Sequence, residues 1–237
     1  MNVTVGDVVL PGDYVGEIST ECDKSHCILG PGLRLHSDKV IVCKSGILKK
    51  KSPNTYYVDC SHQKRYVPAR RESVVGVVTN KGGDIFKVDI GSSEQASLSY
   101  LAFEGATKKN RPDVQVGDVI FSKLVMASRD MEPEVVCVDH YGKKGKLGEL
   151  PEGGFIFTCS LNLIRKILHK KCPLLKLLGK EIPHEIVIGM NGKVWVKAPT
   201  TEKTIAVCNA ILAAEHITNE EIVYMCDDLV NVLAKME

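Results

Sequence analysis

The stretch Glu185–Ala198, EIVIGMNGKVWVKA, places the glycine turn Gly189–Gly192 between two apolar runs. Both runs alternate in the manner of half-buried β-strands. A short glycine turn either clamps the phosphates of a nucleic acid or reverses the chain, and the neighbouring elements decide which. Asn191-Gly192 is a dipeptide that tolerates the positive φ angles of a hairpin turn. The stretch therefore predicts a β-hairpin, and its second strand carries the only tryptophan, Trp195.

The patterns around this hairpin predict a KH-type domain. A strand pattern lies at 154–160, and apolar residues recur at helical spacing over 161–170 and 173–181, where the second helix is expected to stop near Gly179. Two more helices are expected after the hairpin, over 201–216 and from 219 onward. Ser160 is the expected N-cap of the helix over 161–170. Thr200 or Thr201 is expected to cap the helix over 201–216, and Asn219 the last helix. The order strand, helix, helix, strand, strand, helix, helix is that of a KH domain with one extra C-terminal helix.

The position of the glycine turn argues against a phosphate clamp. In a KH domain the clamping Gly-x-x-Gly joins the first two helices. Here that junction reads HKKCP, residues 169–173, and contains no glycine. The turn lies between two strands instead, so we interpret it as a structural element made of Gly189, Asn191, Gly192 and Trp195.

Upstream of this domain the sequence is rich in strand patterns. Up to residue 68, short β-like runs are broken by turn residues such as Pro11-Gly12, which predicts a small N-terminal β domain over 1–68. The segment 73–91, SVVGVVTNKGGDIFKVDIG, predicts two strands joined at Asn80–Gly83. A third strand continues through Tyr100, and two more follow the polar loop 104–113. Five strands with a long basic loop after the third predict a five-stranded OB barrel.

These patterns define a mixed α and β, multidomain fold. We expect the N-terminal β domain at 1–68, the OB domain at 69–150 and the α/β KH-type domain at 151–237. A chain of 237 residues with 44% hydrophobic and 25% charged residues has the composition of an ordinary globular protein. Its apolar runs are too short to cross a bilayer and its first residues do not resemble a signal peptide, so we expect no membrane association.

The nine cysteines are odd in number and scattered, as expected for thiols in a reducing compartment. Cys22 and Cys27, with Cys43 and Cys60 further on, could supply the ligands of a zinc site. The spacing lacks a second pair of the CxxC kind, so we expect no metal and no cofactor.

Charge suggests where RNA would bind. The net charge is only +2, but basic residues gather in several short clusters that leave room for a local positive surface. Basic loops and exposed aromatic rings are what OB domains use to hold single strands. The candidate RNA-binding residues are Lys108, Lys109, Asn110 and Arg111 in the long loop, with Phe86, Lys87 and Tyr100 on neighbouring strands. Core packing is the alternative for Phe86.

No arrangement typical of catalysis is present in the sequence. The segment GKKGKLG lacks the spacing and the hydroxyl residue of a P-loop, and no carboxylates converge as a two-metal nuclease requires. The histidines do not lie in a nucleophile–base pattern. We therefore expect that the protein is not an enzyme, and an exonuclease is the less favoured alternative.

Segments spread over nearly the whole chain resemble the cap subunits of the eukaryotic RNA exosome. The matching stretches are GDVVLPGD (6–13), GPGLR (30–34), 73–91, 96–118, DMEPEVVCVD (130–139) and IGMNGKVWVKA (188–198). The resemblance implies an N-terminal domain, an S-one-type OB domain and a KH domain. It also implies a non-catalytic, RNA-binding subunit that sits in a hetero-oligomer on a ring of RNase-PH-like subunits.

The same resemblance implies a biological role and location. Such subunits guide single-stranded RNA toward 3'-to-5' degradation and processing, including ribosomal RNA maturation, in the nucleus and nucleolus and also in the cytoplasm. A free-standing RNA-binding factor that uses OB and KH modules, for instance in translation, remains the alternative.

Overall fold

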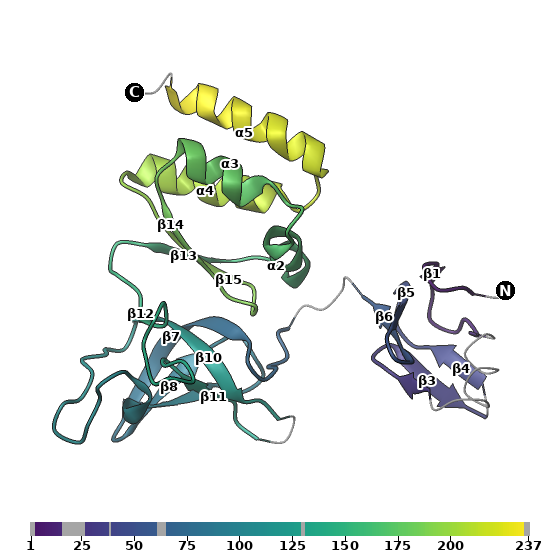
Figure 1. The fold of residues 1–237 in the computed structure, drawn as a ribbon, viewed down its shortest axis with the longest axis horizontal. Helices are drawn as coiled ribbons and strands as arrows, with labels where there is room; N and C mark the ends of the chain where they lie inside the picture. Colours follow the sequence, from purple (N-terminus) through teal and green to yellow (C-terminus); the bar gives the residue numbers. More distant parts are fainter. Residues whose placement is uncertain (1–2, 16–26, 38, 61–64, 129–130, 235–237) are drawn as a thin grey trace. The chain divides into compact units, whose positions relative to one another are not determined.

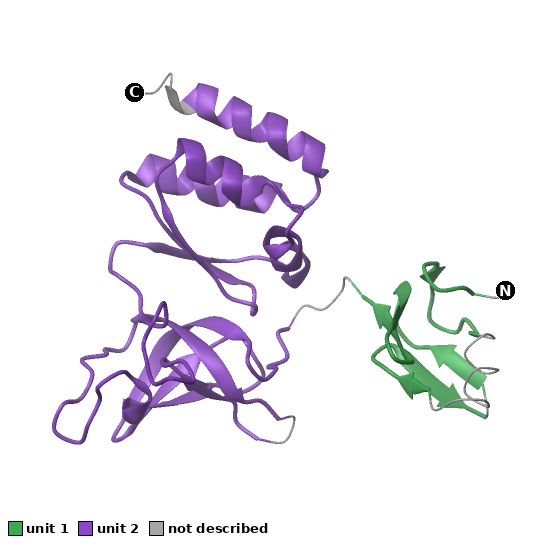
Figure 2. Cartoon of the chain, viewed as in Figure 1, with its two compact units in different colours: residues 1–63 green, residues 64–237 purple. Residues whose placement is uncertain are grey.

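In the computed structural model the chain forms two compact units, residues 1–63 and 64–237, shown in two colours in Figure 2. The structure describes residues 3–15, 27–37, 39–60, 65–128 and 131–234. Among them, none of the helices combines the length and the apolar character needed to span a lipid bilayer.

The first unit is built from short strands, as expected for the N-terminal β domain. Its strands are β1 (Val8–Val9), β2 (Ile28–Leu29), β3 (Leu33–His36), β4 (Lys39–Val42), β5 (Gly46–Lys51) and β6 (Thr55–Asp59). They form a sheet in the order β1-β5-β6-β2 and a separate β3-β4 pair. Buried valines and Leu48 fill the space between the strands, so this unit has a hydrophobic core of its own.

The first half of the second unit is the predicted five-stranded barrel. Its strands are β7 (Ser73–Gly82), β8 (Ile85–Asp89), β9 (Ala96–Ser99), β10 (Val119–Met126) and β11 (Glu134–Val136). The barrel closes because β11 pairs with β9 in parallel and with β10 in antiparallel orientation. A further short strand, β12 (Gly148–Glu149), pairs with β10.

Two details of the barrel differ from the sequence prediction. Gly82 pairs with Ile85, so the first hairpin turns at Gly83 and Asp84 and not over Asn80–Gly83. The third strand ends at Ser99, and Tyr100 begins a 3-10 turn, η1 (Tyr100–Ala102), instead of extending the strand. The reason is local, because the Ser99 hydroxyl accepts a hydrogen bond from the Leu101 N–H at 3.3 Å and caps the turn.

The second half of this unit has the element order expected of a KH domain. The elements are β13 (Phe155–Thr158), α2 (Leu161–Leu168), α3 (Leu174–Glu181), β14 (Glu185–Ile188), β15 (Lys193–Lys197), α4 (Thr201–Ala213) and α5 (Asn219–Ala234). The strands form a sheet in the order β13-β15-β14. The helices cover one face of this sheet and the barrel lies toward the other (Figure 1).

The helix ends follow from local chemistry, with two corrections. Ser160 and Thr200 cap α2 and α4 through their hydroxyls, as predicted. Helix α3 continues through Gly179 to Glu181 and does not stop near the glycine. The cap of α5 is Thr218 and not Asn219. The Thr218 hydroxyl accepts from the Glu221 N–H, and the Glu221 carboxylate accepts from the Thr218 N–H at 2.7 Å, which makes a capping box.

Candidate nucleic-acid interface

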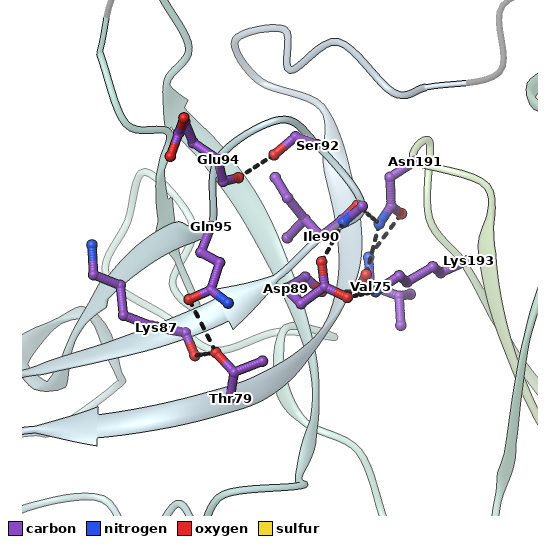
Figure 3. A network of polar contacts seen from close by, with 11 residues as sticks. Val75, Thr79, Lys87, Asp89, Ile90, Ser92, Glu94, Gln95, Asn191 and Lys193 are labelled. Atoms are coloured by element: carbon purple, nitrogen blue, oxygen red, sulfur yellow. Dashed lines mark hydrogen bonds and ion pairs between the residues drawn. The ribbon is translucent and has the colours of Figure 1, made fainter.

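The glycine turn of the KH hairpin docks directly onto the barrel. The Asn191 side-chain amide donates to the carbonyl oxygens of Val75 and Ile90, each at 2.7 Å, and its oxygen accepts from the Val75 N–H at 3.2 Å (Figure 3). The Met190 N–H donates to the Ser73 carbonyl at 2.9 Å. Asn191 therefore satisfies buried backbone groups on β7 and just after β8, and joins two domains that are far apart in sequence.

A buried lysine makes a second link beside this turn. The Lys193 ammonium donates to the Asp89 carboxylate at 2.7 Å and to the Asp89 carbonyl at 2.9 Å, and its side chain is 11% exposed. Burial alone would raise the pKa of Asp89, but the hydrogen bonds from Lys193 and the Gly91 N–H outweigh it and lower the pKa. The pair therefore stabilises the fold above the ordinary aspartate pKa of 3.8, and this is lost as the pH falls through the lowered value.

Apolar contacts strengthen the same junction. Met190 packs against both the KH core and the barrel core. Val194 and Val196 of β15 point into the KH core under the helices. Trp195, between them, faces the other side of the sheet and is only 2% exposed. One hairpin thus contributes to the KH core with one face and to the domain junction with the other.

Both glycines of the turn are required by space or backbone conformation. Gly192 has a φ of +84°, and a Cβ there would lie 2.7 Å from the Cys159 carbonyl oxygen. A Cβ on Gly189 would lie 2.7 Å from the Val75 backbone nitrogen and would collide with the Asn191 side chain. Gly192 supplies the turn conformation, and Gly189 allows the hairpin to approach β7 closely.

Replacing Gly192 with valine is expected to lower the free energy of unfolding of the 64–237 unit by more than about 1 kcal/mol. A β-branched residue resists the positive φ, and its side chain would clash with Cys159. The measurement is urea denaturation, with Gly145→Ala as a control, because Gly145 also has a positive φ of +55° but has open space around it. A Gly192→Val protein that melts like the parent and loses RNA binding would restore the phosphate-clamp interpretation.

In the predicted RNA-binding loop, Arg111 contacts the barrel, whereas Lys108 and Lys109 form no ion pair with another described residue. The Arg111 guanidinium donates to the Asp84 carboxylate at 3.1 Å and lies over the Tyr100 ring, 4.8 Å from its centroid. Lys108 and Lys109 are exposed and form no hydrogen bond or ion pair with other residues that the structure describes. Arg111 therefore holds the loop against the barrel, and the two lysines remain available for phosphates. Asn110 is exposed beside them.

The other three candidate residues, Phe86, Lys87 and Tyr100, do not form an exposed surface on which bases could stack. Phe86 and Tyr100 are 5% and 6% exposed and belong to the barrel core, which is the alternative we gave for Phe86. Rings buried to this extent offer no free face to a base. Lys87 forms an ion pair with Glu132 at 2.5 Å. In this structure the three residues pack and pair within the barrel.

The junction that would hold a phosphate clamp in other KH domains is compact here. Helix α2 ends at Leu168. The turn that follows contains exposed Lys170 and Lys171 and buried Cys172, and Pro173 is the N-cap of α3. The turn is closed by the Cys172 N–H, which donates to the His169 carbonyl at 2.9 Å. Two lysines can still attract phosphates, but no pair of glycine N–H groups is presented to them.

Within the described residues, no group of three or more His, Cys, Asp or Glu side chains is placed to hold a metal ion. Cys27, Cys43 and Cys60 are free thiols, and Cys22 lies outside the described residues.

Sequence reasoning placed Asn191 in the structural turn but missed that it couples the two domains, and it missed Asp89 and Lys193 altogether. One signal was present: Lys193 directly precedes the apolar residues Val194–Val196 in a predicted strand, and a lysine that becomes buried there needs a partner. The identity of that partner could not be read from the sequence, because Asp89 is 104 residues away.

The fold and its coupled domains define a multidomain protein of the S1–KH RNA-binding class. Family models match residues 66–148 (exosome complex component RRP40, S1 domain), 154–202 (KH domain) and 6–61 (mammalian exosome complex component RRP40, N-terminal). The chain is 47% identical to exosome complex component RRP40 of Drosophila melanogaster, over 94% of this chain and 95% of the relative. The chain belongs to the family of exosome complex component RRP40.

A second relative agrees with this family, and a solved structure agrees with the fold. The human exosome complex component RRP40 is 49% identical over 84% of this chain and 74% of the human protein. A solved structure assigned to an exosome complex RNA-binding protein superposes with a TM-score of 0.59 at 21% identity, and covers 71% of this chain and 99% of its own. At that identity the second comparison supports the fold alone.

Proposed function

We propose that this exosome component is a non-catalytic, RNA-binding cap subunit. It sits on a ring of RNase-PH-like subunits and guides single-stranded RNA into the ring for 3'-to-5' degradation and processing, including ribosomal RNA maturation. The observation that carries the proposal is the sequence similarity to an exosome component over nearly the whole chain, with family models matching in three domains. Nuclear and nucleolar localisation, with a cytoplasmic fraction, belongs to the same proposal.

The structure is well suited to such a role. The barrel and the KH domain, which we place at 69–150 and 151–237, are joined by buried hydrogen bonds and an ion pair and not only by a linker. A wall that guides RNA must hold its basic loops at fixed positions, and this junction fixes the barrel relative to the KH domain. The N-terminal domain, proposed at 1–68, supplies separate surface for contacts with other subunits.

Co-purification tests the proposal most directly. A tagged copy is expected to bring down RNase-PH-like subunits in equal molar ratio and to elute from gel filtration far above its own 26.0 kDa. The isolated chain is expected not to shorten single-stranded RNA with Mg²⁺ or Mn²⁺. Elution of the cellular protein as a monomer would favour the free-standing factor. Metal-dependent RNA shortening that follows this chain through purification would mean that it is a nuclease.

A second prediction concerns the loop between the third and fourth barrel strands. The double variant Lys108→Gln/Lys109→Gln is expected to fold normally, because exposed charges contribute little to stability. It should weaken RNA binding by the assembled complex and flatten the slope of log affinity against log salt by up to about 1.4, at ~0.7 per phosphate contact.

The matched control neutralises two exposed lysines on α3, Lys176→Gln/Lys180→Gln, and should leave the salt slope unchanged. Arg111→Gln is a third variant and should act differently, because it releases the loop from Asp84 and Tyr100. Equal affinity and slope for the Lys108/Lys109 variant and the parent would place the RNA path away from this loop.

A further inference from the structure

A basic cleft lies on the outer face of β10 and β11. Its volume is about 780 Å³, and its floor is apolar, made by Val125, Val136 and Val138. Its polar lining is made by Arg70, Arg71, Lys123, Asp139 and His140. None of these residues was among the candidates that the sequence suggested for RNA binding.

The arginines are held at the rim by backbone pairing. The Arg71 N–H donates to the Leu124 carbonyl at 2.8 Å, and the Leu124 N–H donates to the Glu72 carbonyl at 2.9 Å, so the segment before β7 runs along β10. Arg71 has a φ of +70°, a conformation that non-glycine residues rarely adopt. A strained backbone that persists at the rim of a cleft is a frequent mark of a functional position.

The cleft carries an excess of positive charge. Arg70 and Arg71 are exposed, and neither guanidinium pairs with a carboxylate among the described residues. Asp139, the carboxylate that lines the cleft, lies 3.8 Å from the Lys123 ammonium and 2.8 Å from the His140 ring nitrogen. The hydrogen bonds to His140 lower the pKa of Asp139, so it is ionised at neutral pH. One negative charge thus faces three permanent positive charges.

An exposed aromatic ring stands beside this charge. Tyr141 is 79% exposed, and its ring centroid lies 3.9 Å from that of His140 at an interplanar angle of 41°. The turn that carries it is ordered by hydrogen bonds, because the Asp139 N–H donates to the Lys143 carbonyl and the Gly142 N–H to the Asp139 carbonyl, both at 2.8 Å. A cationic groove next to an accessible aromatic face is the combination that binds single-stranded nucleic acid.

We propose that this cleft is a second single-stranded RNA subsite, in which Arg70 and Arg71 hold a backbone phosphate and Tyr141 stacks on a neighbouring base. The guanidinium fork matches phosphate oxygens in a bidentate manner. The valine floor and the free tyrosine face suit a flat base better than they suit an acidic side chain. This inference rests on the proposed function, since it assumes that the chain binds RNA. It adds a contact on the outer face of β10 and β11 to the loop with Lys108 and Lys109.

The test uses the full purified chain and a fluorescein-labelled oligouridylate of twelve nucleotides, with affinity measured by anisotropy over a salt series. Arg70→Gln/Arg71→Asn removes both charges, and asparagine tolerates the positive φ at position 71. The expected result is about tenfold weaker binding and a salt slope reduced by about 0.7, the value for one phosphate contact. The control, Lys176→Gln/Lys180→Gln, loses the same charge on α3 and should bind like the parent.

A second arm separates phosphate from base. Tyr141→Ala should weaken binding of oligouridylate about fivefold and leave binding of an abasic oligomer of equal length unchanged. The urea midpoint of each variant verifies folding, and Arg70→Gln alone replaces the double variant if that protein is unstable.

The outcomes separate the two proposals. Parent-like affinity and salt slope in the folded Arg70/Arg71 variant would overturn the cleft and leave the RNA-binding function intact. The cleft proposal would also be overturned if the Arg70/Arg71 variant bound RNA like the parent but lost binding to a polyglutamate peptide. The cleft would then be a peptide site. Failure of the parent chain and of the assembled complex to bind any single strand would overturn the proposed function itself, and the subsite with it.

Discussion

Replacing Trp195 with alanine is expected to lower the free energy of unfolding of the 64–237 unit by about 3–5 kcal/mol, the usual cost of removing a buried aromatic ring. The indole is 2% exposed and lies on β15 between Ile156 of β13 and Val187 of β14. Gly154 packs so closely on the ring that no Cβ would fit there. The cavity could not collapse, because β-strand pairing holds the surrounding residues on both sides.

Urea denaturation followed by circular dichroism measures this effect. Tyr224→Ala is the control, because that aromatic residue lies on α5 and is 71% exposed, so its loss should change stability by less than about 0.5 kcal/mol. Gly154→Ala tests the same packing from the other side and should also destabilise the unit. Equal midpoints for Trp195→Ala and the parent would show that the indole is not packed as the structure places it.

The second large effect is expected for Asn191→Ala, at about 2–3 kcal/mol. The substitution leaves the N–H and C=O of Val75 and the C=O of Ile90 without their side-chain partner in a buried position. Since these bonds join two domains, the variant should also lose cooperativity, and the barrel and the KH domain should unfold in separate transitions. Hydrogen exchange or two-probe denaturation would detect the separation.

Asn231→Ala is the matched control, because Asn231 is exposed on α5 and alanine favours a helix. Asn191→Asp adds a sharper comparison. The carboxylate keeps the size of the side chain, but when ionised it cannot donate to the two carbonyls. A single transition with unchanged midpoint in Asn191→Ala would mean that Lys193 and Met190 alone couple the domains.

Much of this fold is readable from the sequence because its signals are local. Ser160 and Thr200 cap their helices as predicted, and the alternating apolar residues of β7, β8 and β15 identified these segments as strands. The wrong predictions also have local causes, because a neighbouring side chain forms a hydrogen bond that the prediction did not include. Thr218 forms a capping box that Asn219 cannot form, and the Ser99 hydroxyl turns the chain before Tyr100 can extend the strand.

The candidate site was less readable, because its chemistry depends on pairing across long separations. Basic residues in one loop look equivalent in the sequence, but Arg111 is bound by Asp84 while Lys108 and Lys109 are not. Phe86 and Tyr100 could have faced solvent or core, and only the closure of the barrel decides. The Arg70–Arg71 cleft depends on the segment before β7 lying along β10, which no local pattern indicates.

Because both faces of β15 are packed, the length of the turn before it is restricted. Val194 and Val196 point to one face, and Lys193 and Trp195 to the other, so every residue of the strand has a fixed side. Inserting or deleting one residue in the Gly189–Gly192 turn would exchange these faces, and would bring a lysine and an indole under the helices. We therefore expect homologues to keep the length of this turn, whereas the exposed segment 107–110 of the barrel loop can lengthen or shorten between species at little cost in folding stability.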